Sequence, residues 1–261
     1  MPEITSRQHS LVRAFKAAAR GEADVLLDGW HLLRDAADAG IAISTVAIMD
    51  RPHAPAHLTL LERLSSTADV LTVSPMVMDA LSPVRTPSGV VALATAKSYV
   101  FDDLLRPAPA LLVVASDVQD PGNAGAIIRS AEAGGATGVI FTGASADPWG
   151  WKALRAAMGS TFRLPVVRDP DVRHACHAVS RTGVLVRAAV PQGGVPLQQV
   201  DLRPATALLL GGEGGGLTNE VLLLADEQVT IPMHPPVESL NVAVAAALLV
   251  YEAGRQRAAG R

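Results

Sequence analysis

The chain contains few aromatic residues and almost no cysteine. Aromatic residues make up 3% of its 261 positions, and Cys176 is its single cysteine. One cysteine cannot form an internal disulfide. The scarcity of rings disfavours the stacking of nucleobases on an aromatic platform, and the core must be built from Ala, Val and Leu.

Long hydrophobic runs are also missing. The longest apolar stretches, such as "VAVAAALLVY", fall short of the roughly 18 to 20 residues that span a bilayer. The start "MPEITSRQHS" lacks the charged and then apolar pattern of a signal peptide. We therefore expect a cytoplasmic protein with no membrane segment.

The net charge of −3 neither indicates nor excludes a polyanionic partner, but basic residues gather in residues 1–20 and 151–163. Those of the first segment are Arg7, Arg13, Lys16 and Arg20. They lie on an expected helix, "SRQHSLVRAFKAAAR", with Leu11, Phe15 and Ala18 on one face and Ser6 or Ser10 as its cap. The two segments predict a surface that faces RNA phosphates. From charge alone, two solvated faces are an equal alternative.

The order of expected elements predicts two α/β domains. Residues 1–100 alternate short strands with helices, and "FDDLLRPAPA" at 101–110 has the prolines of a linker. From 111 to 261 the strands and helices alternate again, ending in a long helix at about 239–257. This alternation predicts a parallel sheet covered by helices on both faces.

Three unusual loops follow strands of the second domain: "QDPGNAGAIIRS", "GGEGGGLTNE" and "IPMHPPVESLN". Ligands of parallel sheets gather at the carboxyl ends of the strands, so we expect the three loops to face one crevice. The glycine loop brings backbone amides close to a ligand. It carries Glu213, expected to be buried, where a phosphate loop would carry Lys, which excludes a P-loop.

Four polar side chains in these loops are candidates for chemistry. Arg129 follows Asn123 by six residues among apolar neighbours, and a partly buried Arg needs a carboxylate or phosphate partner. A purely structural ion pair with Glu213 or Glu132 is the alternative. Ser239 and Asn241 precede the last helix, where either is also a natural cap.

A metal site finds little support in the sequence. The stretch "RHACH" brings His174, Cys176 and His177 together on an outer helix, but no second ligand cluster accompanies it. We therefore expect no metal.

Three motifs together resemble those of the SpoU/TrmH family of RNA 2'-O-ribose methyltransferases. They are "NAGAIIRSAEAGGATGVIFTG", "LLLGGEGGGLTNE" and "IPMHPPVESLNVAVAAALLVYE". The resemblance covers residues 110–257, and residues 1–100 resemble the L30e-like RNA substrate-binding domain of the rRNA-directed branch. It implies a C-terminal SPOUT domain at 111–261 with a deep trefoil knot, S-adenosylmethionine as cofactor, and a homodimer.

The resemblance also implies roles for individual residues. The catalytic set is Arg129, Asn123, Glu213, Ser239 and Asn241. The cofactor-binding set is Gly211, Gly212, Glu213, Gly214, Ile231, Met233, Leu240 and Asn241. Because arginine stays protonated, we expect Arg129 to clamp a phosphate beside the target ribose rather than act as a base. The expected reaction is 2'-O-methylation of 23S rRNA, with tRNA methylation or non-catalytic RNA binding as alternatives.

Overall fold

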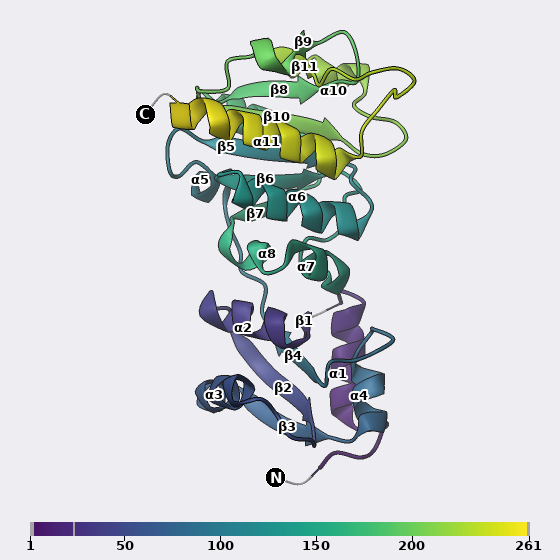
Figure 1. Ribbon diagram of the computed structural model, residues 1–261. Coiled ribbons are helices and arrows are strands. Elements are labelled where there is room, and N and C mark those ends of the chain that lie inside the picture. Colours follow the sequence, from purple (N-terminus) through teal and green to yellow (C-terminus); the bar gives the residue numbers. More distant parts are fainter. Residues whose placement is uncertain (1–2, 23, 260–261) are drawn as a thin grey trace. The chain divides into compact units, whose positions relative to one another are not determined.

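The computed structural model describes residues 3–22 and 24–259, which fold as two compact units (Figure 1). Unit 1 comprises Met1–Lys97 and Trp149–Arg163, and unit 2 comprises Ser98–Pro148 and Leu164–Arg261. Residues 149–163, which the sequence pattern assigns to the second domain, thus make most of their contacts with the first. The domain boundaries expected from the sequence stay a prediction.

Unit 1 is built on a four-stranded sheet with the strand order β1-β4-β2-β3. Its strands are β1 (Val25–Asp28), β2 (Ile43–Met49), β3 (Asp69–Val73) and β4 (Val90–Ala94). Its helices are α1 (Ser10–Ala19), α2 (Trp30–Asp38), α3 (Pro55–Leu64), α4 (Pro75–Leu81), α7 (Trp151–Ala157) and α8 (Ser160–Arg163). Strand β4 runs antiparallel to β1 and β2, whereas β2 and β3 are parallel.

The two faces of this sheet carry separate hydrophobic cores. Phe15 of α1 and Met78 of α4 belong to one core cluster, and Leu33 of α2 and Leu61 of α3 belong to the other. Because successive strand residues point to opposite faces, Leu26 and Leu27 of β1 serve different clusters. Helices α1 and α4 therefore cover one face, and α2 and α3 cover the other.

The first helix differs from its sequence-based description in two details. Its buried residues are Val12, Phe15 and Ala18, whereas Leu11, which was expected on the buried face, is only partly buried. The expectation of a serine cap is wrong: His9 is the N-cap, and its Nδ1 accepts a hydrogen bond from the backbone N–H of Leu11 at 3.2 Å. The hydroxyl of Ser6 accepts from the N–H of Gln8 instead, which leaves it outside the helix.

Unit 2 contains a seven-stranded, wholly parallel sheet with the order β7-β6-β5-β10-β8-β11-β9. Its strands are β5 (Leu111–Ser116), β6 (Gly138–Thr142), β7 (Val166–Asp169), β8 (Leu185–Ala189), β9 (Val195–Pro196), β10 (Thr206–Gly211) and β11 (Glu227–Thr230). Its helices are α5 (Phe101–Leu104), α6 (Pro121–Ala133), α9 (Val172–Ser180), a 3-10 turn (Leu197–Gln199), α10 (Asn219–Leu222) and α11 (Val242–Ala259). The parallel α/β fold predicted from the alternating pattern is confirmed.

Helices cover both faces of this sheet, as expected for central strands that are buried throughout. On one face, Leu104 of α5, Cys176 of α9 and Val221 of α10 pack in a cluster with Leu112 and Leu209. On the other face, α11 packs beside α6 and against β5 and β10 (Figure 1). No helix in the described part of the chain is long and apolar enough to cross a membrane.

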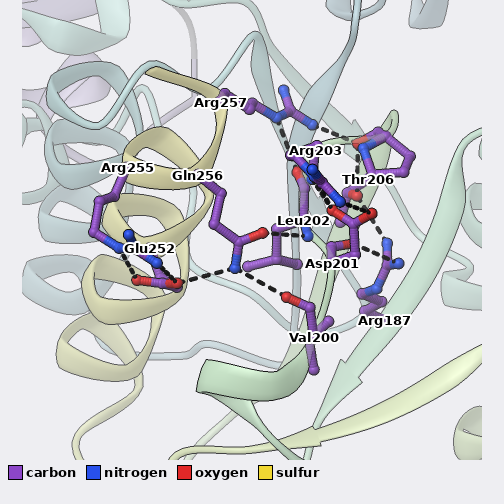
Figure 2. A network of polar contacts seen from close by, with 11 residues as sticks. Arg187, Val200, Asp201, Leu202, Arg203, Thr206, Glu252, Arg255, Gln256 and Arg257 are labelled. Atoms are coloured by element: carbon purple, nitrogen blue, oxygen red, sulfur yellow. Dashed lines mark hydrogen bonds and ion pairs between the residues drawn. The ribbon is translucent and has the colours of Figure 1, made fainter. Parts of the chain in front are cut away.

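A polar network holds the end of α11 at the amino edge of the sheet (Figure 2). Arg257 donates to the carbonyls of Pro109 at 2.8 Å and Ala110 at 3.0 Å, just before β5. It also donates to the carbonyls of Leu202 at 3.0 Å and Pro204 at 2.7 Å, just before β10. This one guanidinium therefore ties the last helix to the segments that enter the two central strands.

Candidate active site

The loops that follow β5, β10 and β11 lie at the carboxyl edge of the seven-stranded sheet. The first of them leads into α6, where Asp120 is the N-cap and Pro121 is the first helical residue. Asp120 Oδ1 accepts a hydrogen bond from the backbone N–H of Asn123 at 2.8 Å. A capping aspartate followed by proline is a strong helix start, so it fixes Asn123 in the first turn.

The side-chain amide of Asn123 joins the three loops. Its Nδ2 donates to the carboxylate of Glu213, and its Oδ1 accepts from Nδ2 of Asn241 at 3.0 Å. Asn241 Oδ1 then accepts the N–H groups of Ala243 at 2.9 Å and Val244 at 3.2 Å, which caps the start of α11. The two partners of Asn123 are 90 and 118 residues away in sequence. The expected meeting of the three loops therefore occurs.

The path of the glycine loop is set by a close approach between two backbones. A Cβ atom on Gly212 would lie 1.9 Å from the carbonyl oxygen of Asp117, which no side chain can tolerate. Asp117 has a left-handed backbone with φ of 58°, and its Oδ1 accepts from the N–H of Ala144 at 2.9 Å. Aspartate tolerates this conformation better than most residues. Asp117 thus holds the β5 and β6 loops together beneath the glycine loop.

The loops after β8, β10 and β11 line a cavity of about 770 Å³ in unit 2, whereas Asn123 and Arg129 of the β5 loop lie outside its lining. All eight residues of the predicted cofactor-binding set line it: Gly211, Gly212, Glu213, Gly214, Ile231, Met233, Leu240 and Asn241. Ser239 lines it as well. The walls combine glycine backbone with apolar side chains, and the volume lies within the range of about 300 to 1,000 Å³ that small-molecule sites occupy.

The cavity has one wall that sequence reasoning missed. Residues 189–192 line it directly after β8, which pairs with both β10 and β11. The sequence does not reveal the strand order. Because β8 lies between β10 and β11 and runs parallel to both, the residues that follow it must reach the same edge of the sheet. The turn "PQGG" after an apolar strand was the available signal.

A family comparison identifies this arrangement. The model of the SpoU rRNA methylase family matches residues 110–251. The chain belongs to the SpoU rRNA methylase family. This confirms the resemblance carried by the three motifs.

Known SpoU methylases are similar along most of the chain. The chain is 31% identical to the 23S rRNA (guanosine(2553)-2'-O)-methyltransferase RlmP of Bacillus subtilis, over 87% of this chain and 86% of the relative. The structure of an AdoMet-bound rRNA methyltransferase from Sinorhizobium meliloti superposes with a TM-score of 0.87 at 28% identity, over 97% of both chains. AviRb from Streptomyces viridochromogenes, in complex with AdoMet, gives a TM-score of 0.86 at 29% identity, over 97% of this chain and all of its own.

Two sequence-based expectations about this SpoU-family site are wrong. Glu213 is exposed rather than buried, and its carboxylate accepts a hydrogen bond from Asn123. Arg129 is also exposed, and within residues 3–22 and 24–259 no ion pair joins it to Glu213. The helix explains this, because Ile127 and Ile128 point into the core and Arg129 is rotated about 100° beyond Ile128.

The four residues predicted to bind RNA phosphates fall into two groups. Arg7, Lys16 and Arg20 line a hollow of about 510 Å³ next to α4, whereas Arg13 lies outside it. Arg20 also pairs with Glu22 at 2.5 Å, and both side chains are exposed. Asp79 lines the hollow too, so the positive charge available to a polyanion there comes mainly from Arg7 and Lys16 and is reduced by one carboxylate.

The residues of "RHACH" have ordinary structural partners. His174 Nδ1 lies 2.5 Å from Asp169 Oδ2, and Cys176 is buried in the core under α9. Burial raises the pKa of the Cys176 thiol to about 11. Among the residues that the structure describes, no group of three or more His, Cys, Asp or Glu side chains has the arrangement of a metal site.

Proposed function

We propose that this protein transfers a methyl group from S-adenosylmethionine to a ribose 2'-hydroxyl of 23S rRNA. The observation that carries the proposal is the Glu213–Asn123–Asn241 contact at the cavity of a SpoU-family chain. RlmP, by its name, acts in this way on 23S rRNA. The S. meliloti and AviRb structures, which cover 97% of this chain, contain AdoMet.

The cavity has the chemistry that this cofactor requires. Exposed backbone of the glycine loop offers N–H and C=O groups to an adenosine, and Ile231, Met233 and Leu240 offer apolar surface. Glu213 adds a carboxylate, which favours a cationic sulfonium where a Lys would repel it. S-adenosylmethionine, when bound, supplies an electrophilic methyl group and needs no metal.

The chain's own residues would position the ribose rather than remove its proton directly. The exposed guanidinium of Arg129 is available to bind a phosphate beside the target ribose with two parallel N–H donors. Ser239 and Asn123 would orient the sugar, and Glu213 would hold the Asn123 amide in place. The 2'-hydroxyl proton would then pass to that phosphate or to a water molecule. The same contacts would hold the 2'-oxygen in line with the methyl carbon that it attacks.

Two features of the family, the knot and the homodimer, are proposed with this function. The entry of β10 between β5 and β8 supports a trefoil knot formed by the glycine loop and residues 231–241. Val244, Leu248 and Tyr251 on α11 are 48%, 44% and 54% exposed and form one apolar stripe, which supports pairing with a second copy. A monomer by light scattering at micromolar concentration would contradict the homodimer.

Single-turnover methylation by Arg129 variants tests the function and separates an enzyme from an RNA binder. With saturating rRNA and cofactor, wild type should methylate, and Arg129→Ala should lose the chemical step while it keeps the fold and the cofactor affinity. Arg129→Lys should restore little, because a point charge lacks the two-pronged contact. Full activity of Arg129→Lys would reduce its role to general charge attraction. A wild type that methylates neither rRNA nor tRNA would favour the non-catalytic alternative.

A further inference from the structure

A cluster of histidine, arginine and tryptophan side chains lies on the α2 and α3 face of unit 1, opposite to the α1 face. The ring of His57 stacks on Trp30 with a centroid distance of 3.9 Å and an interplanar angle of 3°. His53 meets the same Trp30 edge-on at 5.2 Å. His31 and Arg51 complete the cluster as exposed side chains. A planar stack beside cationic groups is unusual in a chain with 3% aromatic residues.

Arg51 is held in place with most of its donors unused. Its Nη2 donates to the carbonyl oxygen of Ser88, and a Cβ atom on Gly89 would lie 2.6 Å from the same nitrogen. Gly89 thus leaves the space that the guanidinium occupies. A guanidinium has five N–H donors, and the described part of the chain shows one hydrogen bond from this one. An exposed arginine that is oriented by one hydrogen bond keeps its other donors for an anion.

Asp50 precedes Arg51 in the chain, but within the described ranges no ion pair joins it to the cluster. The acidic groups of α2 are already engaged, Asp35 with Arg34 at 3.4 Å and Asp38 with Arg63 at 2.8 Å. Within the described ranges, no ion pair links a carboxylate to His57, His53 or Arg51.

Two of the histidines have hydrogen-bond partners of their own. Arg34 donates to His31 Nδ1 at 3.3 Å, so that nitrogen carries no hydrogen. His53 Nε2 donates to the Met49 carbonyl at 3.1 Å, because a carbonyl oxygen can only accept. Burial lowers the pKa of His57 first, and the nearby His53, His31 and Arg51 lower it further. An anion bound among these groups would oppose that effect.

We propose that Trp30, His31, Arg51, His53 and His57 form a second RNA-binding site on unit 1, which holds a phosphate at Arg51 and the histidines and a base beside the Trp30–His57 stack. Stacking on aromatic rings together with cationic groups is a general way to bind single-stranded RNA. The site lies on the other face of the sheet from the Arg7 and Lys16 hollow, so the two groups of cationic side chains are separate. The inference rests on the proposed function, because it takes RNA as the ligand.

Fluorescence anisotropy of the full chain with labelled twelve-residue oligoadenylate tests this site. At constant ionic strength, wild type should bind at least about fivefold more tightly at pH 6 than at pH 8, because His57 takes up a proton on binding. Arg51→Gln and His57→Gln should each weaken binding about tenfold at pH 6, and His57→Gln should also reduce the pH dependence. Arg63→Gln is the matched control, since it removes an exposed arginine of α3 already paired with Asp38.

Each other outcome overturns the site or the function separately. If both variants bind oligoadenylate as wild type does at both pH values, the site is wrong, even when the wild type methylates rRNA. If polyglutamate displaces the RNA at equal charge concentration, the cluster binds acidic chains in general and the RNA assignment fails. If the wild type binds no S-adenosylmethionine by calorimetry and methylates no RNA, the proposed function fails first.

Discussion

The two edges of the seven-stranded sheet treat their polar groups in opposite ways. At the amino edge, Arg187 is 7% exposed and donates to Thr206 at 2.8 Å and to the Asp201 carbonyl at 2.9 Å (Figure 2). It also donates to Glu227 at 3.1 Å. At the carboxyl edge, Glu213, Ser239 and Asn241 are exposed around a cavity. Polar groups that are buried and fully bonded stabilise a fold, whereas polar groups left accessible can act on a ligand.

Helix α11 connects the two edges. It begins after the Asn241 cap beside the cavity, and its last turn places Arg257 in the amino-edge network. Burial lowers the pKa of Arg257, and the positive charge of the nearby Arg187 lowers it further, because the two guanidinium groups repel each other. They are held by backbone carbonyls and by Glu227, which offsets their repulsion. We infer that the amino edge fixes the helix whose other end shapes the site.

The largest expected effect comes from adding one methyl group at the carboxyl edge. Gly212→Ala should weaken S-adenosylmethionine binding about 100-fold, or ~2.7 kcal/mol, because its Cβ would overlap the Asp117 carbonyl and displace the loop. Gly215→Ala is the control in the same loop, since a Cβ there meets no atom within 4 Å. Calorimetry measures both affinities, and equal losses in the two variants would refute the role of the Asp117 contact.

The next effect removes the anchor of the amino edge. Arg257→Ala should lower the free energy of unfolding by about 2 kcal/mol, because four backbone carbonyls lose a charged donor. Arg255→Ala removes a neighbouring arginine whose pairing with Glu252 is exposed to solvent, so its effect should be much smaller. Urea unfolding compares them. If Arg257→Ala also strongly slows methylation per folded molecule, the amino edge affects chemistry as well as stability. That result would contradict the division between the edges.

A smaller effect is expected where the three loops meet. Asn123→Asp would set one carboxylate against that of Glu213 and should slow single-turnover methylation about tenfold, or ~1.4 kcal/mol, with little change in stability. Gln119→Glu adds the same charge to an exposed position of the same loop. If the two variants are slowed equally, net charge rather than the Asn123 contact is responsible.

The amino and carboxyl edges also differ in how far the sequence predicts them. The glycine loop and the "DPGN" start of α6 are local signals that can be read from the sequence. The eight predicted cofactor residues all line the cavity. The expected burial of Glu213 and its ion pair with Arg129 were wrong, because they depend on helix rotation and on contacts about 90 residues apart. The Arg187 and Arg257 network was not foreseen for the same reason: its acceptors are mostly backbone carbonyls, which every residue carries and no motif marks.

The smallest expected effect lies between the two edges, at Cys176 in the core under α9. Burial raises the pKa of this thiol to about 11 from an ordinary value of 9.0, with Asp171 as a lesser cause. The folded protein therefore holds the proton more tightly than the unfolded chain, and this contribution to stability is complete below pH 9 and is lost as the pH rises toward 11. Cys176→Ala should consequently be methylation-competent at pH 7.5, and its stability should fall less than that of wild type between pH 9 and 11.

Because the thiolate is the reactive form, a disulfide reagent should label native wild type at pH 8 only as fast as the protein unfolds. Rapid labelling of the folded protein, at a rate independent of urea below the unfolding transition, would show that Cys176 is accessible and that its pKa is not raised by burial.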